Sequence, residues 1–322
     1  YSDEPDNGYR NYMELFLPSK KWNKEYIFAR NQGTGYSDNI HQEKCMAANG
    51  MGGWSGLCPT QELVDAYEMA NGSTPIIGYN ADGTPIINGA SGYSETGFAA
   101  TAGKHYPAGV YNMYVGREPR FYASINFNGQ QWRGRQLEFW QGGKDGINVS
   151  KVDYCCTGYL LRKTADEGVD VINGKGGMKE ASILFRVGSL YLDYAEALNE
   201  AEGPVDDVYK YVDAIRKRAG LPGLAKGLDK DKMRERIQHE RQIELAFEAG
   251  HRYFDCHRWK IAEKTDNGYM HGMNITATNK VDYSKRSTVG DSRVFEKKHY
   301  LFPIPQSEMD KRIGLVQSPY WE

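Results

Sequence analysis

The sequence predicts a mainly α-helical fold in which helical hairpins of tetratricopeptide type join a long, irregular, loop-rich segment with a few short strands. Residues 1–180 hold 26 of the 36 glycines and four of the six tryptophans. Turn signals such as Asn-Gly and Asp-Gly recur through the same part and break its apolar pattern into short pieces. From about residue 181 apolar residues repeat with helical spacing instead. We therefore divide the chain into a loop-rich segment, 1–180, and a helical segment, 181–322.

The composition is typical of a folded protein with a net charge close to zero. The 322 residues include 40 Lys and Arg against 42 Asp and Glu, and 40% are hydrophobic. A net charge of -2 provides no broad positive field for a nucleic acid backbone, so we expect no nucleic-acid partner. No apolar run reaches the roughly 18 residues that a membrane-spanning helix needs.

The five cysteines are too few and too scattered for a disulfide framework, and their odd number leaves at least one unpaired. His41, Cys45 and Cys58 lack the paired spacing that places two thiolates on one metal ion. We therefore predict no metal site and no cofactor.

In the loop-rich segment, residues 59–67 predict one helix. Thr60 is placed to cap it, and Leu63, Val64 and Tyr67 form an apolar face. The surrounding loops are rich in Ser, Asp, Asn and Gly and carry aromatic side chains, a composition typical of recognition surfaces.

The helical segment begins with two amphipathic helices joined by a very short turn. Apolar side chains step by three and four residues from Leu184 to Leu198, and the first helix stops at Gly203-Pro204. The second runs from Val205 to Ala219. The short connection predicts antiparallel packing, as in a tetratricopeptide hairpin. We expect the apolar face of the first helix to consist of Leu184, Val187, Tyr191, Tyr194 and Leu198.

A third helix is predicted from a cap at Asp231 to Gly250, and a shorter fourth over 254–262. One hairpin cannot bury its faces alone, because stacked helical repeats need at least about three units for a continuous core. Either the loop-rich segment covers the hairpin, or earlier helices of a longer protein do so, and we favour the second explanation.

The sequence contains no convincing catalytic motif. Glu240, Glu244 and Glu248 follow one another at one-turn intervals, which could provide paired carboxylates for acid–base work. Arginines lie close to each of them in sequence, and such neighbours keep carboxyl pKa values low. We interpret the cluster as structural ion pairs.

Several stretches, in order along the chain, closely resemble the SusD/RagB family. The earlier ones are residues 21–25, 59–67 (PTQELVDAY), 120–125 (RFYASI) and 142–146 (GGKDG). The later ones are residues 185–201 (FRVGSLYLDYAEALNEA), 215–222 (IRKRAGLP), 240–248 (ERQIELAFE), 251–259 and 300–305 (YLFPIP). The resemblance covers nearly the whole chain but only the C-terminal portion of a family member.

This resemblance implies one continuous SusD-like domain that lacks its N-terminal helical half. It further implies a surface-exposed lipoprotein of the outer membrane that binds oligosaccharide or polysaccharide and passes it to a SusC-like TonB-dependent transporter. The lipidated cysteine of the family has no counterpart here, so membrane contact is expected only through an anchor upstream of this chain. The family has no catalytic residues to carry over, and we predict that the chain is not an enzyme.

A sugar site needs flat exposed aromatic rings beside planar polar groups. Trp54 is our first candidate, because its flanking glycines give little surface to bury an indole and Asn49 is near. Trp132 with Arg133 is the second, and Tyr36 and Tyr93 are weaker ones. We interpret Trp22 and Trp259 as packing residues.

Two other functions remain open. The helical hairpin could be a protein-interaction scaffold that binds a partner protein or peptide. A glycoside hydrolase that uses carboxylates such as Glu138 or Asp145 has no distinctive spacing to support it. The sequence does not identify the glycan.

Overall fold

The computed structural model describes residues 7–17, 23–31, 36–175, 181–248 and 250–321, in which helices predominate and strands are short. This architecture confirms the predicted fold class. The helices are α1 (Gly8–Met13), α2 (Tyr36–Met46), α3 (Gln61–Ala66), α4 (Pro119–Ser124), α5 (Val187–Glu202), α6 (Asp206–Arg218), α7 (Lys230–Glu244), α8 (His251–Arg258), α9 (Ala262–Thr265), α10 (Lys280–Tyr283) and α11 (Gln306–Met309). No helix in these ranges is both long and apolar enough to cross a bilayer.

The strands form two-stranded antiparallel pairs. They are β1 (Tyr26–Asn31) with β8 (Ala181–Arg186), β2 (Ile76–Tyr79) with β3 (Pro85–Ile87), β4 (Ile125–Phe127) with β7 (Tyr159–Leu161), β5 (Gln131–Trp132) with β6 (Arg135–Gln136), and β9 (Gly268–Met273) with β10 (Arg286–Arg293).

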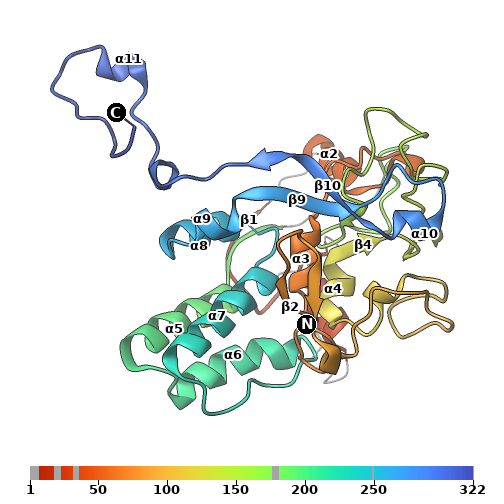
Figure 1. Cartoon of the computed structure of the whole chain (residues 1–322), viewed down its shortest axis with the longest axis horizontal. Coiled ribbons are helices and arrows are strands. Elements are labelled where there is room, and N and C mark those ends of the chain that lie inside the picture. The colour runs from red at the N-terminus through yellow and green to blue at the C-terminus, as the bar shows by residue number, and fades with distance from the viewer. Residues whose placement is uncertain (1–6, 18–22, 32–35, 176–180, 249, 322) are drawn as a thin grey trace.

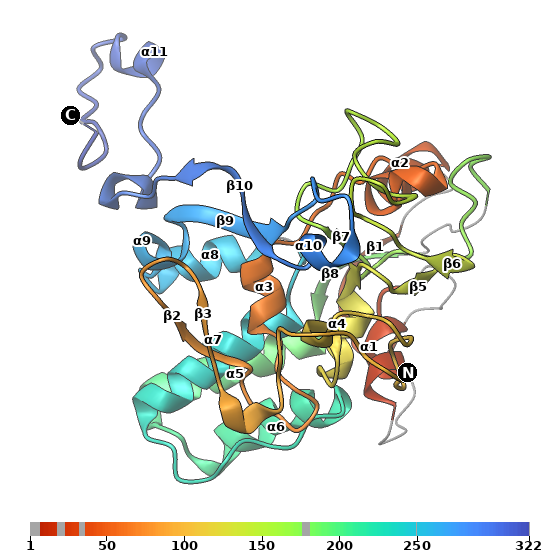
Figure 2. The same cartoon turned by 45° about the vertical axis from the view of Figure 1, so that its right-hand side comes forward.

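Helices α5, α6 and α7 lie together as one helical layer, below the loops and the β9–β10 ribbon in Figures 1 and 2. Their shared cluster packs side chains from all three helices, including Ala195, Val208, Val212, Met233 and Ile237. The hairpin α5–α6 was predicted from the apolar spacing, and its short turn over Gly203 is present as expected.

The first helix of this hairpin differs from the prediction in its start and in its buried face. Residues 181–186 form strand β8 against β1, so α5 begins at Val187. Leu192, Ala195 and Asn199 are buried, whereas Tyr194 is exposed. The buried face is thus about one residue further round the helix than predicted, because α6 and α7 contact it there and small side chains allow close approach.

Helix α7 is shorter than predicted at its C-terminal end. Its cap is Asp229, whose side chain accepts a hydrogen bond from the backbone N–H of Lys232, rather than Asp231. The helix ends at Glu244, since Phe247 adopts a left-handed backbone conformation with φ 63°. Such a φ interrupts a right-handed helix. Two short helices, α8 and α9, replace the single fourth helix that was predicted.

One large core joins the loop-rich segment to the helical one. Helix α3 begins directly after Thr60, although the Thr60 side chain makes no capping hydrogen bond. Its Val64 and the following Tyr67 are fully buried beside Phe121, Phe127 and other aromatic side chains. Ile243 of α7 and Met273 of β9 belong to the same cluster. The loops are therefore held by a packed interior and not only by the helical layer.

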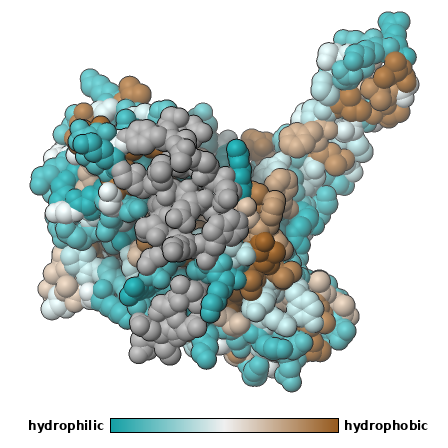
Figure 3. Space-filling view, turned by 180° about the vertical axis from the view of Figure 1, so that it is seen from behind, coloured by the Kyte–Doolittle hydropathy of each residue, from teal (hydrophilic) through white to brown (hydrophobic). Residues whose placement is uncertain are grey.

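The C-terminal part leaves the body after β10. The segment with α11 projects away from the rest of the chain in both cartoon views (Figures 1 and 2). From behind, this projection carries a mixture of hydrophilic and hydrophobic surface (Figure 3).

Candidate functional site

The segment that carries Trp54 is a tight loop after helix α2. Backbone N–H groups of Trp54 and Ser55 donate to the carbonyls of Lys44 and Ala47, at 2.6 and 3.0 Å. A Cβ on Gly53 would lie 2.1 Å from the Ala47 carbonyl oxygen, so only glycine allows this approach. The loop is rigidly attached to α2, and it leaves the indole of Trp54 38% exposed. The predicted exposure of this ring is confirmed, and its contact with a ligand stays a prediction.

Helix α2 supports the Trp54 ring. The His41 imidazole stacks on the indole with centroids 5.5 Å apart, and the Lys44 ammonium lies 5.5 Å from the ring centroid. Asn49, the predicted polar neighbour, fixes the loop instead. Its side-chain amide donates to the Gly146 carbonyl at 3.2 Å, and its Oδ1 accepts from the N–H of Gly50.

The expectation of an exposed ring at Trp132 is wrong, because its side chain is only 2% exposed. Trp132 ends strand β5, and a two-residue turn follows in which Arg133 and Gly134 both have positive φ. Successive side chains of a strand point to opposite faces. Gln131 therefore faces solvent while the Trp132 indole points inward, where the Arg162 guanidinium lies 4.7 Å from its ring centroid.

Arg133 is also occupied within the fold. Its guanidinium donates to the carbonyls of Val169 at 2.6 Å and Asp166 at 2.9 Å, and it pairs with Glu43 at 3.2 Å. Burial lowers the pKa of Arg133. These bonds hold three segments together and leave the group unsuited to reach a ligand.

The two tyrosine candidates lie in surroundings other than the exposed loops that were predicted. Tyr93 is 6% exposed, its hydroxyl donates to Glu95 at 2.7 Å, and the Arg117 guanidinium covers its ring. Tyr36 begins helix α2 rather than lying in a loop, and its side chain falls outside the described part of the chain. Trp22 also lies outside the described residues.

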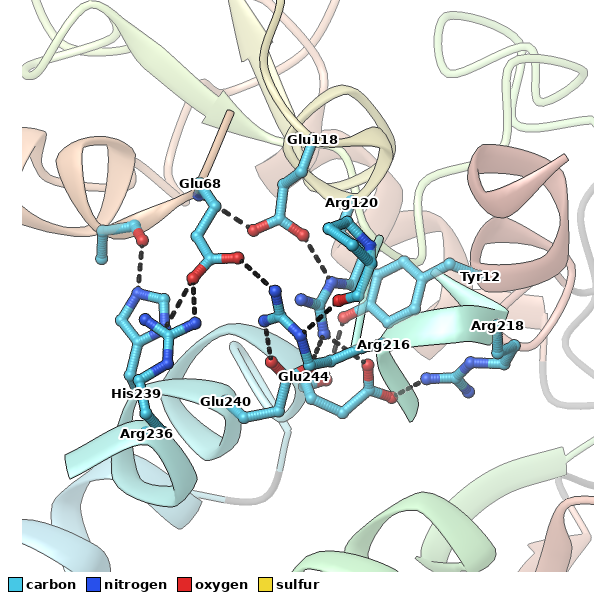
Figure 4. A network of polar contacts seen from close by, with 12 residues as sticks. Tyr12, Glu68, Glu118, Arg120, Arg216, Arg218, Arg236, His239, Glu240 and Glu244 are labelled. Carbon is cyan, nitrogen blue, oxygen red and sulfur yellow. Dashed lines mark hydrogen bonds and ion pairs between the residues drawn. The ribbon is translucent and has the colours of Figure 1, made fainter. Parts of the chain in front are cut away.

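The carboxylates at the end of α7 are the centre of a buried ion network (Figure 4). Glu244 pairs with Arg120 at 3.1 Å, with Arg186 at 2.8 Å and with Arg218. Burial alone would raise the pKa of Glu244, but the three arginines outweigh it and hold the pKa well below the ordinary value. A general acid needs the opposite shift, so the interpretation as structural ion pairs is supported.

The same network ties distant parts of the chain to α7. Glu240 pairs with Arg120 at 2.6 Å and with Arg216 at 3.0 Å, and Glu68 pairs with Arg216 at 2.9 Å. Glu248 pairs with Lys163 at 2.6 Å. Each charge in this group has partners, so the network positions elements and offers no free acid or base.

Asp145, one of the two carboxylates suggested for a hydrolase, is held in a structural ion pair. Asp145 is buried, receives two hydrogen bonds of 2.6 and 2.7 Å from Arg135, and accepts the backbone N–H of Glu138. A substrate could not reach it without breaking this pair. Among the described residues, His, Cys, Asp and Glu form no group that could hold a metal ion.

A cleft that the sequence did not predict lies around the turn at residues 103–107, and we name it the His105 cleft. Two hollows of about 320 and 600 Å³ share Lys104, His105 and Tyr106, so this turn separates them. The rings of Tyr9 and His105 stack at 4.9 Å, and those of Tyr106 and Tyr122 at 6.1 Å. Volumes of this size are typical of small-ligand sites.

Polar groups line the smaller hollow beside these rings. They include Gln130, Gln131 and Arg162. The Gln130 side chain is 4% exposed, and neither its Oε1 nor the Nε of Arg162 has a hydrogen-bond partner among the described residues. Burial, together with the charges of Lys104 and Arg162, lowers the pKa of His105 to about 4, so this ring is neutral at physiological pH. Both atoms are buried below the surface of the hollow, so a ligand there would meet the rings and the exposed Gln131 side chain rather than these two atoms.

A local signal for the cleft exists in the sequence. Gly103 and Pro107 bracket His105 and Tyr106, and turn residues around two aromatic side chains mark a loop that presents rings. The predicted site favoured tryptophans and did not include this turn. The remaining residues of the smaller hollow come from positions 9, 130, 131 and 162, which no local pattern connects.

Known proteins with similar sequences or folds agree on one family. The model of the SusD family matches residues 19–321. SusD-like protein P25 of Formosa agariphila is 42% identical over 82 residues, or 24% of this chain and 15% of that protein. SusD-like protein P2 of the same organism is 29% identical over 154 residues, or 44% of this chain and 26% of that protein.

Solved structures give the same result over almost the whole chain. A SusD-like protein of Bacteroides fragilis has a TM-score of 0.73 and 30% identity, covering 98% of this chain and 58% of that one. A SusD-like carbohydrate binding protein of the same species has a TM-score of 0.67 and 25% identity, covering 93% and 56%. The chain spans little more than half the length of these structures. It belongs to the SusD family.

Proposed function

We propose that this chain binds oligosaccharide or polysaccharide without catalysis, at the outer surface of the outer membrane, for delivery to a SusC-like TonB-dependent transporter. Members of the SusD family are carbohydrate-binding proteins rather than enzymes, which is consistent with the expectation that this chain is not an enzyme. A lipid anchor, as in the family, would hold the protein at the membrane.

The observation that carries the proposal is the His105 cleft. Stacked tyrosine and histidine rings line it together with Arg162 and the exposed amide side chain of Gln131. Such a site can cover the apolar C–H face of a pyranose and bond its hydroxyls. The exposed ring of Trp54 is a second proposed contact for a longer chain.

We expect weak binding, with dissociation constants between micromolar and millimolar, because the desolvation of hydroxyls offsets most of the hydrogen bonding. Tyr106→Ala and Trp54→Ala should each lose about 1–3 kcal/mol of binding free energy, as aromatic stacking contributes in other ligand classes. Calorimetry with oligosaccharides from a glycan array measures this. Tyr269→Ala, at an exposed tyrosine on β9, is the matched control and should bind like the parent chain.

Polysaccharide gels and an assay for reducing ends separate the functions. Retarded migration without release of reducing ends supports capture, whereas release of sugar indicates a hydrolase. If both aromatic variants bind as the parent does, the proposed contacts are misplaced.

The scaffold function has one observation in its favour. Tyr194 and Leu190 of α5 are exposed, and Tyr194 meets Tyr211 of α6 edge to face at 5.0 Å. Aromatic rings on a helical face are common anchors for a protein partner. If the chain binds no polysaccharide, the result favours a protein-binding function at this face.

A further inference from the structure

Three thiols come together beside the base of the Trp54 loop. The Sγ atoms of Cys58 and Cys155 are 3.9 Å apart, and Cys156 also contacts the Cys58 thiol. Cys155 is 2% exposed, Cys58 is half-buried and Cys156 is exposed. Cys58 and Cys155 are 97 positions apart in the sequence, so the fold alone makes them neighbours.

The backbone holds these two segments in place. The N–H of Leu161 in β7 donates to the Leu57 carbonyl at 2.9 Å, directly before Cys58. Disulfide sulfurs are about 2.05 Å apart. Closure therefore requires the two sulfurs to move from 3.9 Å apart to this distance, by rotation about their Cα–Cβ bonds and adjustment of the neighbouring backbone.

We propose that Cys58 and Cys155 are an oxidisable pair that closes to a disulfide when the protein meets a small-molecule disulfide oxidant. The Cys58 thiolate attacks one sulfur of the oxidant, forms a mixed disulfide and expels one thiolate. The Cys155 thiolate then attacks the Cys58 sulfur and expels the second. Two protein thiols lose two electrons and two protons, and one oxidant disulfide becomes two thiols.

The surroundings favour Cys155 as the resolving thiol. It is shielded from solvent, so the finished disulfide would be protected from reductants. Its Sγ now donates to the Tyr159 carbonyl at 2.9 Å, and that carbonyl keeps a second donor, the Thr157 hydroxyl at 3.3 Å, after the thiol proton is lost. Formation of the disulfide therefore leaves the Tyr159 carbonyl with a hydrogen-bond donor.

Reaction should be slow at neutral pH. The hydrogen bond with Cys155, together with burial, raises the pKa of Cys58 above the ordinary thiol value. The thiolate is the reactive form, so the oxidation rate should increase as the pH rises from about 7 to about 9.

The test uses the full chain with and without oxidised glutathione. Thiol counting in denaturant should fall from the five cysteines of the sequence by two. Mass spectrometry of an unreduced digest, with fragmentation, should show Cys58 linked to Cys155. Because the link closes a loop of 97 residues, the melting temperature should rise by about 5–10 °C on oxidation.

Serine variants identify the pair. The link should be absent in Cys58→Ser and Cys155→Ser and retained in Cys156→Ser, with Cys45→Ser as a control outside the cluster. An unchanged thiol count in the parent chain would overturn the proposal without any variant. If Cys58 still forms a disulfide in Cys155→Ser but not in Cys156→Ser, its partner is Cys156, and the assignment of Cys155 is overturned. Neither result depends on whether the chain binds glycan.

Discussion

At the scale of single residues, burial separates Trp54 from Trp132. Both are tryptophans with glycines close by in the loop-rich segment, yet Trp54 is 38% exposed and Trp132 only 2%. The difference arises from the neighbours. A rigid loop presents Trp54 outward, whereas the strand alternation of β5 directs Trp132 against the Arg162 guanidinium.

Replacement of Trp132 should therefore lower the stability of the fold rather than remove a direct contact with glycan. Trp132→Ala should lower the free energy of unfolding by about 3–5 kcal/mol, because a buried indole leaves a large cavity. Urea unfolding measures this, with Trp54→Ala as the matched control, which should change stability by less than about 1 kcal/mol. A stable Trp132→Ala chain with lost glycan affinity would contradict the inward placement of this ring.

Replacement of Glu244 should destabilise the fold as much as replacement of a buried aromatic residue. Glu244→Gln removes a negative charge that faces Arg120, Arg186 and Arg218, so it should destabilise the fold by about 3–5 kcal/mol. Chemical denaturation measures the loss. Glu308→Gln, in an exposed pair with Lys311, is the control and should cost no more than about 1 kcal/mol. Equal effects for the two variants would show that the buried network does not stabilise the fold.

At the scale of elements, close backbone contacts decide where side chains point. The loop after α2 approaches that helix so closely that Gly53 has no room for a Cβ. The hairpin α5–α6 shows the same dependence on neighbours, since the buried face of α5 is set by the helices that pack on it.

Gly53→Ala should displace the Trp54 loop. We expect a loss of about 1–3 kcal/mol in stability, since the new methyl group overlaps the Ala47 carbonyl, and a weaker affinity for glycan. Thermal melts and calorimetry measure the two effects. The control is Gly89→Ala, because a Cβ on Gly89 meets no atom within 4 Å and its φ is not positive. A Gly53→Ala chain that melts with the parent would disprove the tight contact.

At the scale of the whole molecule, buried charge connects the segments. Glu25 of the loop-rich part meets Arg186 and Arg218 of the helical part, and Arg120 of α4 meets Glu240 and Glu244 of α7. Because these pairs cross between distant parts of the chain, their protonation should influence global unfolding.

Acid should destabilise the molecule through this network. The pKa of Glu248 is held at about 2 in the fold: burial opposes ionisation, but Arg186 and Lys163 outweigh it. The pKa of Glu244 is also lowered. The unfolded chain then binds protons more tightly, so this stabilisation is present above about pH 4.5 and is lost as the pH falls toward about 2. Glu118, whose pKa burial raises, acts in the opposite direction.

Urea unfolding between about pH 7 and about pH 3 measures this dependence. Stability should fall with decreasing pH in the parent chain and fall less steeply in Glu244→Gln, which lacks one of the titrating groups. A pH profile that is identical for the parent and the variant would exclude Glu244 as a contributor.

Much of the fold could be predicted from local patterns. Helical spacing and the turn at Gly203-Pro204 identified the α5–α6 hairpin, and dense glycine and turn residues identified the loop-rich segment. The resemblance to the SusD/RagB family rested on short ordered motifs, and residues 19–321 match that family. Prediction failed at residues 181–186, where pairing with β1 overrides a helical apolar pattern.

The sequence by itself determined the family, the class of fold and the structural use of the charged cluster, because spacing along the chain and charge balance are local properties. Only the tertiary structure decided which rings face solvent and which groups share a cleft. Tyr9, His105, Gln130 and Arg162 meet at one hollow, and Cys58 meets Cys155, through contacts that cross many tens of residues. Burial and proximity of this kind depend on how elements pack together, and no single stretch of sequence contains that information.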